Sequence, residues 1–198
     1  MSDYSGKYRP ALERIACLVG RGAGMPGSGA GIPGITDHDI AHAITAARAC
    51  VPTSNPKEVR ADQACIRPEL LELHWGGNMT RAPRIARVAA AHVYDGSDKD
   101  LVRRARLAAV MAAQDLGGDS LSQARLKDAA WIIGTDYRNL EPDCGRAIAW
   151  MHGQLSEAES AFCKALQRIQ DSRPATPARL TGMAARAAAG ITRVRLSA

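Results

Sequence analysis

The chain has 198 residues, a mass of 21.0 kDa, a formal net charge of +6 and a pI of about 9.3. Apolar residues make up 46% of it but aromatic residues only 4%, so alanine and leucine must supply most of the core. That composition favours packed helices over a β-sandwich. We therefore expect an all-α protein with a single compact domain, and its positive charge points to an anionic partner.

The composition also argues against a membrane or secreted protein. No stretch approaches the roughly 18 to 20 apolar residues needed to span a bilayer. The first residues lack a signal-peptide pattern. The five cysteines are odd in number and widely spaced, which fits reduced thiols better than a disulfide framework. We expect a soluble protein of the bacterial host cytoplasm that makes no membrane contact, with most cysteines buried as small apolar side chains.

Residues 1–35 are expected to form an N-terminal segment, with a short helix over 10–20 and a flexible linker over 21–34. This linker contains Gly22-x-Gly24-x-x-Gly27, which matches a dinucleotide fingerprint. The required strand and helix are missing on either side of it, so we interpret it as linker and predict no cofactor.

Thr36 is the expected N-cap of a helix that ends near Cys50. On this helix His38 and His42 are four residues apart, a spacing at which two imidazoles can share a metal ion. No third ligand is evident in the sequence. The alternatives are a metal-dependent enzyme and an ordinary surface helix.

Residues 68–94 predict a helix-turn-helix. Pro68 suits the first turn of a helix, and Gly76-Gly77-Asn78 can end that helix and redirect the chain. Either Asn78 or Thr80 can cap the second helix. Trp75, beside the turn, is expected to anchor the two helices.

Three arginines, Arg81, Arg84 and Arg87, would lie along one face of the second helix because of their spacing of three. A row of guanidinium groups after a tight turn is typical of a helix that enters the major groove of DNA. The other interpretation is a solvated face. The next helix, from Ser97 or Asp98 to Gly117-Gly118, adds a cluster at Arg103, Arg104 and Arg106. We predict that DNA contacts come from Asn78, Thr80, Arg81, Arg84, Arg87, Arg103 and Arg104.

Two further helices complete the domain, which we place at 36–171. Ser120 and Gln123 predict a capping box for a helix ending at Gly134, with Ile132 among its inward residues. The last helix is expected from near Pro142 to about Asp171. Trp131 and Trp150 are interpreted as packing residues. Residues 172–198 contain five arginines and no acidic residue, which predicts a basic C-terminal arm.

Two segments resemble phage late-gene antitermination proteins of the Q type, within residues 67–88 and 137–166. The first runs from Leu70 through His-Trp-Gly-Gly to Arg84-Ile-Ala86, and the second is Tyr137-Arg-Asn-Leu-Glu-Pro142 with the helix after it. The paired Cys-x-x-Cys zinc motifs of the lambda-type branch are absent from the sequence, so no zinc site is carried over.

The resemblance implies a regulator that binds double-stranded DNA near a late promoter and a bacterial RNA polymerase, which then reads through terminators. Arg81, Arg84 and Arg87 would be its DNA-facing positions, and nascent RNA is a further candidate partner. On this hypothesis no reaction is catalysed. The alternatives are a helical structural or adaptor protein with an acidic protein partner, and a metal-dependent enzyme using His38 and His42. The sequence leaves the oligomeric state open.

Overall fold

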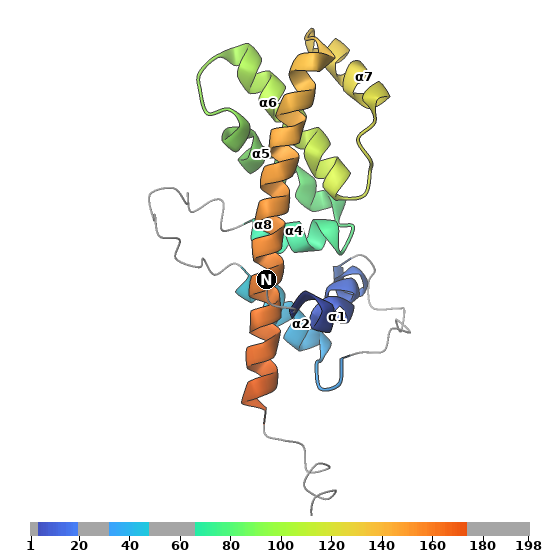
Figure 1. Cartoon of the computed structure of the whole chain (residues 1–198), viewed down its shortest axis with the longest axis vertical. Helices are drawn as coiled ribbons and strands as arrows, with labels where there is room; N and C mark the ends of the chain where they lie inside the picture. The colour runs from blue at the N-terminus through green and yellow to red at the C-terminus, as the bar shows by residue number, and fades with distance from the viewer. Residues whose placement is uncertain (1–3, 20–31, 48–65, 174–198) are drawn as a thin grey trace, which may run out of the picture. The chain divides into compact units, whose positions relative to one another are not determined.

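A computed structural model of the chain describes residues 4–19, 32–47 and 66–173, and within these ranges it is helical with no β-strand (Figure 1). The all-α prediction is therefore confirmed. The helices are α1 (Tyr4–Val19), α2 (Asp37–Ala46), α4 (Arg67–His74), the 3-10 turn η1 (Met79–Arg81), α5 (Ala82–Val93), α6 (Lys99–Leu116), α7 (Gln123–Ile133) and α8 (Tyr137–Ser172). Most of the linker predicted at 21–34 and nearly all of the arm predicted at 172–198 lie outside the described residues.

The contacts divide the chain after Leu166, inside α8. The first unit holds every other described helix and the larger part of α8, and the described part of the second unit is the remainder of that helix and the residue after it.

The helix expected over 10–20 begins earlier than predicted, at Tyr4, so Pro10 lies inside α1. Proline lacks the amide hydrogen that would bond to the carbonyl of Gly6. Gly6 is exposed, so water can satisfy that carbonyl. The Thr36 prediction is confirmed, because Thr36 and Asp39 form a full capping box at the start of α2.

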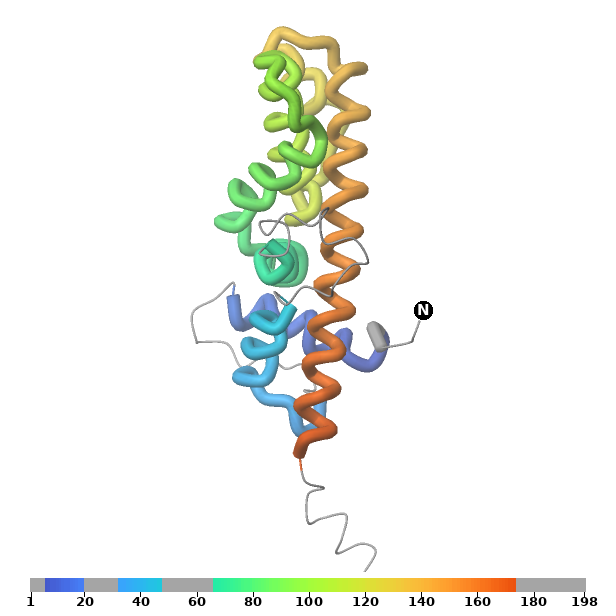
Figure 2. Tube along the Cα trace, turned by 90° about the vertical axis from the view of Figure 1, so that its left-hand side faces the viewer, coloured from blue at the N-terminus to red at the C-terminus, as the bar shows by residue number. Residues whose placement is uncertain are grey.

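Helices α5 and α6 pack against each other through small side chains (Figures 1 and 2). The buried residues of α5 include Ala86, Ala89 and Ala90. Those of α6 include Ala105, Ala108, Ala109, Ala112 and Ala113. Alanine on both sides lets the two helix backbones approach closely.

A stripe of buried residues follows α8 at intervals of three and four, the pattern of a helix with one apolar face. Its members are Leu140, Cys144, Ala147, Met151, Leu155, Ala158, Phe162 and Leu166. The first two belong to one cluster with α6 and α7, made of Ala108, Met111, Leu126, Ala130, Leu140 and Cys144. Helix α8 is thus a packing surface for α6 and α7.

The boundaries of α7 and α8 correct two predictions. Ser122, not Ser120, caps α7, and its hydroxyl accepts a hydrogen bond from the Arg125 amide. Helix α8 begins at Tyr137, so Pro142 lies within it instead of at its start. The predicted stop at Gly134 is confirmed, since this glycine adopts φ 69°, in the left-handed region.

The burial of α7 overturns a core prediction. Trp131 is 85% exposed and Ile132 is 72% exposed. Helix α7 turns a narrow face to the core, with Leu126 and Ala130 buried, and this leaves Trp131 and Ile132 in solvent. Trp150 is half-buried and stacks on His92, with ring centroids 5.3 Å apart, which supports its packing role.

Candidate nucleic-acid interface

A tight turn between α4 and α5 forms as the sequence predicts. Gly77 has φ 62°, a conformation that side chains other than glycine rarely adopt. Gly76 is also required, because a Cβ there would stand 2.5 Å from the carbonyl oxygen of Glu72. Asn78 accepts hydrogen bonds from the Thr80 amide and hydroxyl, at 3.3 and 2.6 Å. Asn78 and Thr80 thus fix the short η1 turn that leads into α5.

Two of the three arginines in the predicted DNA-facing row are ion-paired with α4. Arg81 Nε donates to Glu72 at 2.6 Å, and Arg84 forms a salt bridge with Glu69. The Glu69 side chain is only 6% exposed, so it needs a cation to balance its charge. Arg84 therefore joins α5 to α4, and Arg81 joins the η1 turn to α4. Only Arg87 of the row is exposed without a described ion pair.

The sequence predicts that Trp75 anchors the two helices on either side of the turn, whereas its described hydrogen bond reaches α8. Its indole N–H donates to Glu159 on α8 at 2.8 Å. Helix α4 is held to α8 a second time, by a salt bridge between Arg67 and Glu157. Helix α4, which precedes the turn, is therefore held in place by two polar contacts with α8.

The arginine cluster of α6 divides into two faces. Arg104 Nε donates to Asp143 on α8 at 2.7 Å, and the Asp143 side chain is 4% exposed. Arg103 and Arg106 point elsewhere, are exposed, and have no ion pair among the described residues. Arg104, a predicted DNA contact, is thus occupied inside the fold.

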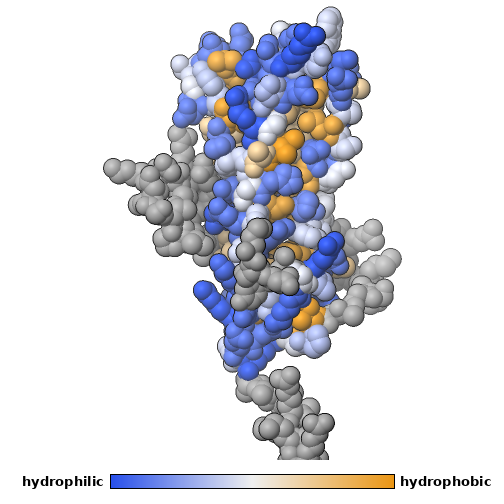
Figure 3. Space-filling view, viewed as in Figure 1, coloured by the Kyte–Doolittle hydropathy of each residue, from blue (hydrophilic) through white to orange (hydrophobic). Residues whose placement is uncertain are grey.

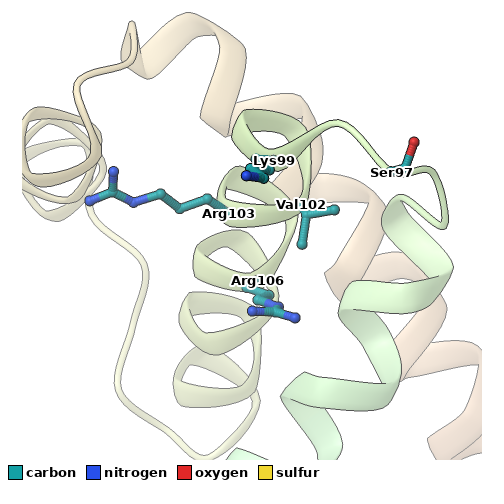
Figure 4. A pocket seen from close by; sticks show the side chains of 5 residues that line it. All are labelled: Ser97, Lys99, Val102, Arg103 and Arg106. Carbon is teal, nitrogen blue, oxygen red and sulfur yellow. The ribbon is translucent and has the colours of Figure 1, made fainter.

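Two further cations of this surface, Lys99 and Arg106, are not among the predicted DNA contacts. With Arg103 they occupy positions four and three residues apart on α6, which places them on successive turns of one side (Figure 4). Together with Ser97 and Val102 they line a shallow hollow of about 410 Å³. Helical spacing alone would have grouped Lys99, Arg103 and Arg106 and set Arg104 apart.

Beside this hollow, a larger groove of about 680 Å³ runs between α5 and α6 and carries Arg87 and Arg106 among its lining residues. Four cations from two packed helices therefore surround one region, which we call the basic face: Arg87, Lys99, Arg103 and Arg106. Figure 3, in which α8 runs down the front of the molecule, shows hydrophobic residues between hydrophilic ones on that face. Arg87 and Arg106 of the basic face line the larger groove, whose other lining residues are mostly apolar, and Lys99 and Arg103 line the adjoining hollow.

Neither metal nor thiol chemistry gains support from the geometry. His38 and His42 are exposed, and the described residues contain no group of three or more His, Cys, Asp or Glu able to hold a metal ion. Burial raises the pKa of Cys144 to about 12 and that of Cys163 to about 11, which keeps both thiols protonated. Their predicted role as buried apolar residues is confirmed, whereas Cys17 is exposed.

No described helix combines the length and apolar character needed to cross a membrane. Comparison of the chain with protein-family models, with curated proteins and with solved structures finds no match.

Proposed function

We propose that the protein is a transcription regulator that binds double-stranded DNA through the basic face. The supporting observation is the division of the cations into two classes. Arg81, Arg84 and Arg104 are each paired with a carboxylate that is largely buried, while the four residues of the basic face have no described ion pair. Unpaired cations repel one another, so a surface that gathers four of them is best satisfied by an anionic partner.

The arrangement suits a duplex because phosphates recur along both strands and can meet cations from two helices at once. Asp98 and Asp100 lie at the start of α6, close to Lys99 in sequence. The Asp98 carboxylate accepts from the amides of Asp100 and Leu101. Asp98 is therefore engaged in capping. On this proposal Arg103 and Arg106 carry more of the phosphate binding than Lys99 does.

The proposal moves the main contacts from the row Arg81–Arg84–Arg87 to the α5–α6 surface. Arg81 and Arg84 keep side-chain exposures of 45% and 46%, so their outer N–H groups can add contacts from the edge. That α5 enters a major groove stays a prediction. The sharper form of the proposal, antitermination with a bacterial RNA polymerase, rests on the sequence resemblance alone.

The test compares matched arginine variants in a fluorescence-anisotropy titration of a random duplex pool. Arg103→Ala and Arg106→Ala should each weaken binding, and the double variant more so. The control is Arg9→Ala, an exposed arginine of α1 paired with Glu13, which should leave affinity unchanged. Sequencing of the retained duplexes then reveals any preferred site. If the wild-type protein does not bind at low salt, or the double variant binds as well as wild type, the proposal is wrong.

A further inference from the structure

The groove between α5 and α6 has an apolar floor that duplex phosphates do not use. Its lining follows one side of each helix at intervals of three or four residues, the periodicity of helix faces. The α5 row is Pro83, Ala86 and Ala90, and the α6 row is Val102, Arg106 and Val110. Val110 is 42% exposed, so part of its apolar side chain is accessible in the groove.

One end of the groove is shaped by a close contact between Tyr94 and Gly96, both of which line it. A Cβ on Gly96 would stand 2.3 Å from the Tyr94 hydroxyl. Gly96 therefore makes room for the Tyr94 side chain over the loop between α5 and α6.

The dimensions and composition suit a helix. Small floor residues such as Ala86 and Ala90 let a third helix approach to the usual interaxial distance of about 8–10 Å. Parallel rows on two helices leave a channel into which the apolar residues of an amphipathic helix can pack at positions i, i+3 or i+4, and i+7.

The charges specify the kind of helix. Arg87 lines the groove from α5 and Arg106 lines it from α6, and neither has an ion pair among the described residues. A docked helix would shield both guanidinium groups from water, which is costly unless it brings carboxylates to meet them. Asp95, at the Tyr94 end, is the one acidic residue among the lining residues of this groove.

We propose that the α5–α6 groove binds an acidic amphipathic helix of a partner protein. The apolar side of that helix covers the alanine and valine floor, and Glu or Asp residues flanking it pair with Arg87 and Arg106. The inference stands on the groove floor and does not require DNA binding. If both proposals hold, the helix and DNA share these two arginines and exclude each other.

The test starts from a display selection of random 16-residue peptides on the full-length protein. We expect the enriched peptides to combine acidic residues with apolar residues at helical spacing. One of them, made synthetically with a fluorophore, then serves as the probe in anisotropy titrations. Ala91→Glu places a carboxylate in the groove and should weaken binding of this peptide at least tenfold. Ala124→Glu, at an exposed alanine of α7, is the matched control and should not.

A second pair of variants separates this proposal from DNA binding. Arg87→Ala should weaken peptide binding. Arg103 lies outside the groove lining, so Arg103→Ala should weaken DNA binding and leave peptide binding unchanged. The proposal is overturned if no peptide is enriched, if enriched peptides lack acidic residues, or if Ala91→Glu binds them as well as wild type. It is also overturned if sedimentation shows a wild-type dimer that Ala91→Glu makes monomeric, because a second copy would then fill the groove.

Discussion

Replacement of Arg104 by alanine tests whether this arginine belongs to the fold or to the binding surface. Asp143 is buried and has two described partners, Arg104 at 2.7 Å and Arg146, whose side chain is 60% exposed. Loss of one hydrogen bond to a charged group costs about 1.5–3 kcal/mol. Because Arg146 remains beside the carboxylate, we expect Arg104→Ala to lower the free energy of unfolding by about 2 kcal/mol.

The neighbouring Arg103→Ala provides the control, since Arg103 is exposed and has no described ion pair. Its effect on stability should stay within about 0.5 kcal/mol. With a urea dependence of about 2 kcal/mol per molar, the unfolding midpoint of Arg104→Ala should fall by about 1 M and that of Arg103→Ala should hardly move. Equal midpoints for the two variants would refute the division of the α6 arginines into two faces.

A double variant tests the pairing itself. If Arg104 acts on stability through Asp143, the double variant Arg104→Ala/Asp143→Ala should lower the free energy of unfolding by less than the sum of the two single variants. Strict additivity would show that the two residues contribute independently and that the contact is not the cause.

Three further predictions concern the cysteine thiols, His92 and Gly145. Native iodoacetamide labelling at pH 8, read by peptide mass spectrometry, should modify Cys17 and spare Cys144, whose pKa is raised to about 12 by burial; equal labelling would contradict this. Partial burial lowers the pKa of His92 below its ordinary 6.5. The unfolded chain therefore binds a proton at His92 more readily than the folded chain does, and stability is lost as the pH falls below about 6.5. His92→Phe should reduce that loss in urea titrations at pH 5 and pH 7, and an unchanged difference would disprove it. Gly145→Ala should stabilise the protein by roughly 0.5–1 kcal/mol, because no atom lies within 4 Å of the added Cβ and helical glycine is unfavourable; a lower melting temperature would count against it.

Local signals in the sequence predicted the ends of several elements. The Thr36 cap, the turn at Gly77 and the stop at Gly134 were predicted because each depends on a few adjacent residues with special backbone or hydrogen-bonding preferences. The all-α class could be predicted from composition, because that prediction does not depend on knowing which helices pack against each other.

Predictions failed where the outcome depends on contacts between distant residues. The apolar residues of α7 surround much of the helix, so their pattern could not show that Trp131 faces solvent. The acid that pairs with Arg104 is 39 residues away and the one that pairs with Arg84 is 15 residues away. Spacing can place arginines on one face, but only the fold shows which of them already have a carboxylate.

The central claim is that the basic face binds DNA through its phosphates, and the salt dependence of affinity tests it most directly. Each phosphate contact contributes a slope of about −0.9 to the plot of log K against log salt concentration. We expect a steep negative slope for the wild-type protein and a slope shallower by about one for Arg103→Ala, with no change for the Arg9→Ala control. A wild-type slope near zero, or equal slopes for wild type and Arg103→Ala, would contradict the claim.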